Sequence, residues 1–155
     1  MKPRRTMLFV ILGLPLIVLI TIGGLVVASW RRPELGVVDG RLRPCRDSPN
    51  CVCSLASDDE HRIDPLPANN GTLERLRQVL NEMPGVQIIE EDENYLRAEC
   101  SSSLLRFVDD MEFLYDSEAG VIQVRSASRV GHSDLGANRK RVEVIRQRLA
   151  KEPSA

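Results

Sequence analysis

Aromatic residues and histidines are scarce in this chain of 155 residues. It contains one Trp, two Tyr, three Phe and two His, so the core of any domain that it forms must be mainly aliphatic. The chain also lacks a Walker loop, a dinucleotide-binding fingerprint, a zinc-protease motif and a Gly-x-Ser-x-Gly nucleophile elbow. These absences remove the sequence signatures by which several common enzyme classes are identified.

Acidic residues are absent from the first 33 positions, and charge of either sign is absent from residues 7–29. This stretch of 23 residues is apolar apart from Thr21 and Ser29. A helix of about 20 apolar residues is long enough to cross the core of a bilayer. We therefore predict a basic tail over residues 1–6 and a transmembrane helix over residues 7–29, which makes the membrane a partner of the chain.

A cleaved signal peptide is the alternative interpretation of the same stretch. Val26-x-Ala28 resembles a small-residue cleavage site, but the apolar part of a signal peptide is usually about 7–15 residues long. Bases flank both ends of the stretch, so the positive-inside rule does not decide the orientation, and the short basic tail favours a cytoplasmic N-terminus. Both interpretations place the rest of the chain outside the cytoplasm.

The residues beyond position 33 contain 16 bases and all 22 acids, a formal charge of −6. A nucleic-acid-binding domain would be basic overall, so we expect no nucleic acid as a partner. Bases are concentrated after Arg125 and acids between Asp58 and Glu118. The simpler explanation is that the C-terminal helix packs near the acidic half, and the alternative is a basic surface that faces anionic lipid headgroups.

Four cysteines are present, and an even number in an exported domain favours disulfide bonds. The turn-forming residues 47–50 separate Cys45 from Cys51, so we predict a Cys45–Cys51 disulfide. Cys53 either pairs with Cys100 or both stay as free, buried thiols. Because the one-residue spacing of Cys51 and Cys53 does not fit a zinc site, we expect no metal, and nothing indicates a cofactor.

Several glycines and prolines in residues 30–44 indicate a linker. We expect an α+β domain over residues 45–150 and a short tail over residues 151–155. Within the domain, Leu73, Leu76, Leu80 and Met83 lie on one face of a helix that Thr72 can cap and Pro84-Gly85 ends. Residues 58–67 are expected to be irregular.

Four short runs then have strand character and short connections, which favours an antiparallel sheet of three to four strands. The runs are Val86–Glu90, Tyr95–Cys100, Leu104–Val108 with Met111–Tyr115, and Val121–Ser126. We expect Asp109-Asp110 to interrupt the third run, because aspartate is a poor strand former. A last helix follows, with Leu135, Val142, Ile145 and Leu149 on its apolar face and Ser133, Asp134 or Asn138 as its cap. Two helices on one sheet make an α+β sandwich.

A polar cluster near the end of the sheet is the main candidate site. If its strands are neighbours, arginines and acids approach one another, and an arginine fork fits a carboxylate or a phosphate. In one hypothesis Arg125 and Arg129 pair with Asp109, Asp110 or Glu112 and fix the sheet register. In the other, arginines, hydroxyls and the start of the last helix bind an anion; the candidate ligand-binding residues are Arg125, Ser126, Ser128, Arg129, Asp134, Asn138 and Arg139.

Catalysis has weaker support from the sequence. Asp109, Asp110 and Glu112 resemble the paired acids of general acid–base chemistry, but adjacent residues of a strand point to opposite faces. His132 fits an exposed loop better than a triad with Ser126 or Ser128. We therefore expect no catalytic residue.

Three motifs, in order along the chain, resemble those of the domain-of-unknown-function 1499 (DUF1499) family. They begin at Cys45-x-x-Ser48-Pro49-Asn50-Cys51, at Phe107-Val108-Asp109-Asp110-x-Glu112-Phe113 and at Val124-Arg125-Ser126-Ala127-Ser128-Arg129-Val130-Gly131, the last continuing to Arg141. Cys53 stands where the family pattern has a serine. The resemblance implies a bacterial envelope protein with its domain on the periplasmic side of the cell membrane. It brings no established activity, ligand or catalytic residue.

Three functions agree with these observations. The first is a membrane-anchored, non-enzymatic module that binds an anionic small molecule, a lipid headgroup or another envelope component. The second is an envelope hydrolase that uses Asp109, Asp110 and Glu112. The third is a scaffold or assembly partner of a membrane complex.

Overall fold

The computed structural model describes residues 3–68 and 71–151, and it describes side chains from residue 13 onward. Residues 1–2 of the expected basic tail and residues 152–155 of the expected C-terminal tail lie outside this description. The elements follow the order α1 (Pro3–Ser29), β1 (Val37–Val38), β2 (Arg41–Leu42), β3 (Cys51–Cys53), β4 (Leu66–Pro67), α2 (Thr72–Asn81), β5 (Val86–Glu91), β6 (Tyr95–Ser101), β7 (Val108–Asp116), β8 (Val121–Ser128) and α3 (Ala137–Ala150).

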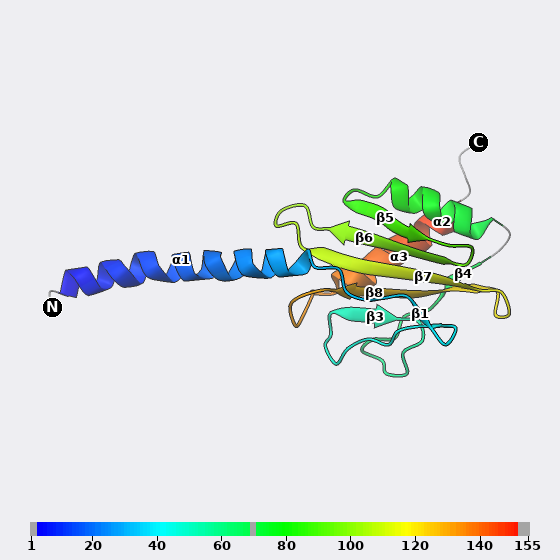
Figure 1. Ribbon diagram of the computed structural model, residues 1–155, viewed down its shortest axis with the longest axis horizontal. Coiled ribbons are helices and arrows are strands. Elements are labelled where there is room, and N and C mark those ends of the chain that lie inside the picture. Colours follow the sequence, from blue (N-terminus) through cyan, green and yellow to red (C-terminus); the bar gives the residue numbers. More distant parts are fainter. Residues whose placement is uncertain (1–2, 69–70, 152–155) are drawn as a thin grey trace.

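One six-stranded antiparallel sheet organises the domain, which confirms the α+β class (Figure 1). Its strands lie in the order β3-β8-β7-β6-β5, and β4 also pairs with β8. The expected count of three to four strands was too low. It missed β3 and β4, which have three and two residues, because such short strands show no alternation of polar and apolar residues.

Strand β7 differs from the expectation at its start. Leu104–Val108 is not a strand: residues 102–107 form a loop, and β7 runs without a break from Val108 through Asp109 and Asp110 to Asp116. The expected interruption does not occur, because both aspartates have arginine partners in the folded chain. Tertiary ion pairing here outweighs the low strand propensity of aspartate.

Helices α2 and α3 cover one face of the sheet, which we call the helix face (Figure 1). Leu76 and Leu80 of α2, Val142 and Ile145 of α3 and Phe113 of β7 are fully buried in the core between them. The helical spacing therefore placed Val142 and Ile145 correctly, as it did the leucines of α2. It was wrong for Leu135, which precedes α3 and is 97% exposed. Gly71, in the left-handed conformation, is the N-cap of α2, and Thr72 is the first residue of the helix rather than its cap.

Residues 30–44 cover the opposite face of the sheet and are not a free linker. Their hairpin of β1 and β2 lies against β7 and β8, and Leu42 within it is buried. We call residues 30–44 the strap and the face that they cover the strap face. The domain therefore has three layers: helices, sheet and strap.

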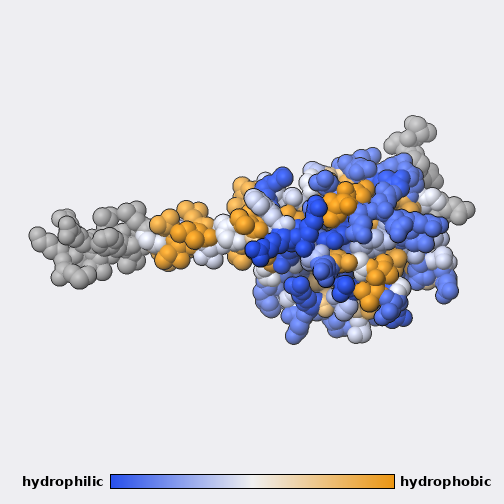
Figure 2. All heavy atoms as spheres, in the orientation of Figure 1, coloured by the Kyte–Doolittle hydropathy of each residue, from blue (hydrophilic) through white to orange (hydrophobic). Residues whose placement is uncertain are grey.

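Helix α1 extends away from the domain (Figure 1). Apolar side chains cover much of the visible face of its described part (Figure 2), and the large ones from Leu14 to Ile20 are 48–67% exposed. Among the residues that the structure describes, no helix has both the length and the apolar character needed to cross a membrane. The transmembrane helix over residues 7–29 remains a prediction.

Candidate functional site

The alternation of side chains along β6, β7 and β8 places a layer of charged groups on the strap face. Residues such as Leu96, Met111 and Val124 face the helices, so the residues between them point to the strap. Register places Arg97 opposite Glu112 and Glu99 opposite Asp110 on neighbouring strands. The members of this charged layer are Arg97, Glu99, Asp110, Glu112, Arg125 and Arg129.

Arg129 and Asp110 form the centre of the layer. The Arg129 Nε lies 2.7 Å and its Nη2 2.8 Å from the two oxygens of Asp110, and the same Nη2 donates to Glu99 at 2.6 Å. Arg97 donates to Asp110 from the other side at 2.9 Å. Burial by itself lowers the pKa of Arg129, but its bonds to Asp110 and Glu99 raise that pKa above its ordinary value.

Glu112 forms the second centre and is 0% exposed. It accepts from Arg125 Nη1 at 3.0 Å, from the Tyr95 hydroxyl at 3.0 Å and from the backbone N–H of Gly36 at 2.8 Å. Burial, followed by the nearby Glu112 charge, raises the pKa of Tyr95, so its hydroxyl stays a donor. These contacts supply the hydrogen bonds that a buried carboxylate needs.

The strap and the end of α1 are joined to this layer. Arg129 donates to the carbonyl of Ser29 at 3.0 Å, and Arg97 donates to the carbonyl of Pro33 at 3.2 Å. Arg32 pairs with Glu99 at 2.7 Å. Although desolvation raises the pKa of Glu99, hydrogen bonds from Arg32 and Arg129 lower it below its ordinary value. The charged layer therefore fixes how α1 enters the domain.

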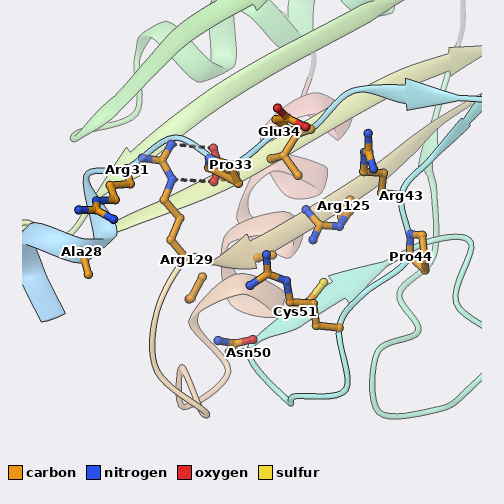
Figure 3. Close-up of a pocket in the computed structure, with 15 residues that line it drawn as sticks. Ala28, Arg31, Pro33, Glu34, Arg43, Pro44, Asn50, Cys51, Arg125 and Arg129 are labelled. Atoms are coloured by element: carbon orange, nitrogen blue, oxygen red, sulfur yellow. Dashed lines mark hydrogen bonds and ion pairs between the residues drawn. The ribbon is translucent and has the colours of Figure 1, made fainter.

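A cavity of about 520 Å³ lies between the strap and the ends of β3 and β8, beside the end of α1 (Figure 3). Its lining contains two acids, Glu34 and Asp110, and five arginines, which are Arg31, Arg43, Arg46, Arg125 and Arg129. We call it the arginine cavity. Its size is typical of sites for small molecules.

Several donors in the arginine cavity have no protein partner. Within the described residues, no hydrogen bond or ion pair involves the side chains of Arg31, Arg43 and Arg46, all of which are exposed. The side chain of Arg125 is 7% exposed, and its Nε has no partner within the same part of the chain. A buried donor without a partner is costly, and the three exposed guanidinium groups beside it are free to receive an anionic group.

The predicted ligand-binding residues divide between the two faces of the sheet. Arg125 and Arg129 line the arginine cavity; Ser128 also borders it, but its hydroxyl accepts from Asn138 on the helix face. Ser126 lies on the helix face and donates to Asn138 at 2.6 Å. Arg139 points elsewhere and donates to the carbonyls of Arg62 and Glu60. The structure therefore brings together only part of the predicted set, along with strap residues that the sequence treated as linker.

The start of α3 is occupied by its own chain. Asp134 accepts from the backbone N–H groups of Gly136 and Asn138 at 3.0 and 2.7 Å, so a carboxylate already lies where the sequence suggested an external anion. Gly136 is the N-cap in backbone terms. Among the three residues proposed as the cap, Asp134 supplies the capping oxygens.

The acidic residues also separate. Asp109 lies on the helix face and pairs with Arg141 at 2.7 Å, whereas Asp110 and Glu112 lie on the strap face. Adjacent strand residues thus point to opposite faces, as the sequence predicted. The hypothesis that Arg125 and Arg129 pair with this group is confirmed for Glu112 and Asp110.

Asn138 is the centre of a second buried network that the sequence analysis did not identify. Its amide nitrogen donates to the Asn50 carbonyl, the Ser128 hydroxyl and Asp134, and its oxygen accepts from Ser126 and Arg141. This asparagine therefore connects β8, α3 and the loop before β3. The signal was the density of short polar residues from Ser126 to Arg141, which we assigned to a ligand instead of to internal hydrogen bonds.

The Cys45–Cys51 disulfide is confirmed, with a Cα–Cα distance of 5.7 Å. Cys53 is a free, buried thiol and Cys100 a free, half-buried one; burial raises the pKa of each. His61 supports the disulfide loop, since its Nε2 lies 3.1 Å from the Ser48 carbonyl and its Nδ1 2.7 Å from Asp58. In the described part of the chain, no group of three or more Cys, His, Asp or Glu residues is arranged to hold a metal ion.

Arg97 and Glu99 belong to the charged layer but were not predicted as site residues, although their pattern in the sequence could have identified them. They alternate with Leu96, Ala98 and Cys100 along one strand, which placed them together on the polar face. The sequence gave no signal that Arg31, Arg43 and Arg46 line a cavity, because the cavity forms only where the strap and the loop before β3 lie beside the sheet.

Comparison with protein families found one match over the domain. The model of the family described as "Protein of unknown function (DUF1499)" matches residues 41–149, which include the whole sheet, α2 and nearly all of α3. Comparisons with curated proteins and with solved structures found no match. Since the match covers more than half of the chain, the protein belongs to the DUF1499 family.

Proposed function

We propose that this protein is a membrane-anchored binding module whose arginine cavity takes the carboxylate or phosphate of an anionic ligand. In this proposal α1 is a single-pass anchor, and the domain lies outside the cytoplasm, on the periplasmic side of a bacterial cell membrane. The observation that carries the proposal is the cavity lining, in which five arginines face two acids.

The charge balance of the cavity supports this reading. Asp110 is already paired with Arg97 and Arg129, and Arg125 is paired with Glu112. Arg129 is also paired with Glu99, so the three arginines and three acids of the charged layer cancel. The uncompensated charge of the lining comes from Arg31, Arg43 and Arg46 against Glu34. An anion that enters the cavity would meet free guanidinium donors, whose planar forks suit carboxylate and phosphate.

The anchor is supported by the sequence of α1 and by its place in the fold. The helix contains the whole uncharged stretch 7–29 and ends at the buried Ser29. At 1.5 Å of rise per residue, about 20 residues of helix match the apolar thickness of a bilayer. Trp30 follows directly and suits the membrane interface.

The geometry gives the hydrolase and scaffold alternatives less support. Asp109, Asp110 and Glu112 are each paired with an arginine and divided between two faces, so they do not converge on one substrate position. Within the described residues, no surface favours a particular protein partner as strongly as the arginine cavity favours an anion.

Native mass spectrometry of the full chain in detergent tests the proposal. The full chain is needed because residues 29–33 contribute contacts to the charged layer. We expect an added mass under native conditions that is lost on denaturation. Inorganic phosphate and a short-chain phosphatidylglycerol then serve as probes. Binding of both indicates a site for a free anionic group, whereas binding of the lipid alone indicates a site for a lipid headgroup.

Matched variants locate the binding. Arg43→Gln combined with Arg46→Gln removes two exposed lining charges without touching the buried pairs, and we expect the retained mass and probe binding to fall. Arg41→Gln is the control, since Arg41 is exposed and does not line the cavity. A chain without bound mass that also binds neither probe would overturn the proposal.

A further inference from the structure

Three large apolar side chains are exposed on two loops of the domain. Leu104 is 86% and Leu105 43% exposed in the loop 102–107 between β6 and β7. Leu135 is 97% exposed in the loop 129–136 between β8 and α3. A single exposed leucine is ordinary on a protein surface, so the argument depends on where these leucines lie.

Both loops lie at the end of the domain where α1 enters (Figure 1). The Trp30 indole donates to the carbonyl of Arg106 at 3.2 Å, and the Val108 N–H donates to the Ser29 hydroxyl at 3.3 Å. Arg129, at the start of the second loop, donates to the carbonyl of Ser29 at 3.0 Å. Trp30 itself is 57% exposed, so an indole and three leucines share this end.

The backbone of both loops is strained at one residue, and no contact within the described residues compensates this strain. Arg106 and Leu135 have φ angles of 59° and 54°, a left-handed conformation that residues with a Cβ rarely adopt. For Leu135 this conformation accompanies nearly complete exposure of an apolar side chain. Such local strain is retained where it serves a contact.

The charges at this end suit an anionic surface. Arg106, next to Leu105, and Arg31, next to Trp30, are exposed, and within the described residues their side chains have no hydrogen-bond or ion-pair partner. Asp134, the nearest acid of the second loop, is turned toward the amides of α3. Basic residues with an exposed tryptophan and leucines are typical of segments that lie in the interface of a bilayer.

We propose that loops 102–107 and 129–136 form a membrane-contacting surface, with Leu104 and Leu135 entering the bilayer leaflet from which α1 emerges. This inference rests on the anchor role of α1 in the proposed function. Contact at both loops would fix the domain against the membrane instead of leaving it on a free stalk. Ala28 and Arg31 line the arginine cavity, so the docked domain would hold that cavity at the level of the lipid headgroups.

Depth-dependent quenching in vesicles tests the proposal, because the chain contains one tryptophan. The full chain is reconstituted in vesicles of phosphatidylethanolamine and phosphatidylglycerol, with or without bromine on the upper part of the acyl chains. In a Trp30→Phe background, Leu104→Trp and Leu135→Trp are made separately. Glu118→Trp is the control, because residue 118 lies in the turn at the opposite ends of β7 and β8.

We expect the tryptophans at positions 104 and 135 to lose at least about half of their intensity in brominated vesicles, since interfacial segments are buried about 5–10 Å. The tryptophan at position 118 should be unaffected. If the tryptophans at 104 and 135 stay unquenched, the inference is overturned. A blue-shifted emission maximum would then show that a protein surface, and not the bilayer, covers the loops.

The native Trp30 separates this failure from failure of the anchor. When Trp30 of the unmodified chain is quenched and the loop tryptophans are not, α1 is in the bilayer and only the docking inference fails. When Trp30 is also unquenched, the anchor itself is wrong. Retention of the melting temperature in each variant shows that the loop substitutions leave the fold intact.

Discussion

The two faces of the sheet differ sharply in what they bury. The helix face buries aliphatic and aromatic groups such as Leu96, Met111 and Phe113 against α2 and α3. The strap face buries Arg97, Asp110, Glu112 and Arg125 under residues 30–44 with almost equal completeness. The same three strands, β6, β7 and β8, supply both layers.

Burial therefore has two physical roles in this domain. Apolar area removed from water stabilises the fold by about 25 cal/mol per Å². Buried ion pairs recover their desolvation cost only in part, but removing one partner is strongly destabilising. The helix face therefore provides stability, whereas the strap face fixes the position of α1 and the strap.

Asp110→Ala should have the largest effect on the strap face. It leaves the buried guanidinium groups of Arg97 and Arg129 without their shared carboxylate, and such a loss costs about 3–5 kcal/mol. Urea denaturation of the full chain in detergent measures the free energy of unfolding. Combining the change with Arg97→Met and Arg129→Met should recover much of the loss; no recovery would show that the pairs themselves supply stability.

Leu76→Ala tests the helix face. Leu76 is fully buried between α2 and the sheet, and truncation of a core leucine costs about 2–5 kcal/mol. Unlike the loss of stability in Asp110→Ala, the loss in Leu76→Ala cannot be recovered by replacing charged partners, because Leu76 has none. Protection of the Gly36 amide from hydrogen exchange should survive in Leu76→Ala below its unfolding transition and decrease in Asp110→Ala.

Asn138→Ala should cost less than either core change. It removes one partner from several groups around α3 and β8, but the Asn50 carbonyl and the Ser126 hydroxyl keep other partners. We therefore expect a loss of about 1–3 kcal/mol, the cost of one buried group left unsatisfied. Asn81→Ala at the exposed end of α2 is the matched control and should lie within about 0.5 kcal/mol of the parent protein. Equal melting temperatures for the two variants would contradict the role given to Asn138.

Tyr95→Phe sharpens the comparison within the strap face. It removes the hydroxyl that donates to Glu112 but leaves the bonds from Arg125 and Gly36. We expect a loss of about 1.5 kcal/mol, the lower end for a hydrogen bond to a charged group. A loss as large as that of Asp110→Ala would mean that Tyr95, and not Arg125, chiefly compensates Glu112.

The smallest effect is expected from acid acting on Glu99. Its pKa is lowered in the folded domain by Arg32 and Arg129, so its contribution is present above the unfolded pKa of about 4.3 and is lost as pH falls through the lowered folded value. Glu99→Gln should reduce the slope of unfolding free energy against pH in this range. An unchanged slope would assign the acid sensitivity to other carboxylates.

Much of the helix face could be predicted from the sequence. The spacing of Leu73, Leu76, Leu80 and Met83 identified α2, and the alternation around Leu96 and Ala98 identified β6 and its apolar side. These signals are local, because a helix or strand repeats its direction within a few residues. The turn between Cys45 and Cys51 likewise brought the correct disulfide partners together.

The strap face could not be predicted in the same way. Residues 30–44 contain prolines and glycines and little periodicity, so nothing local indicates that Leu42 is buried or that Gly36 donates to Glu112. The expected interruption at Asp109-Asp110 was wrong for a related reason, since arginines distant in sequence pair with both aspartates and keep them within β7.

Local sequence patterns were enough to predict the α+β class, most of the apolar faces of the helices, the disulfide and the uncharged stretch that lies in α1. The folded chain was needed to see which arginines are paired, which line a cavity and which leucines remain exposed beside α1. The two kinds of interaction act over different distances along the chain. Backbone periodicity acts over one or two turns of chain, whereas pairing and burial of charge depend on strands and loops that the fold brings together from as far apart as Ser29 and Arg129.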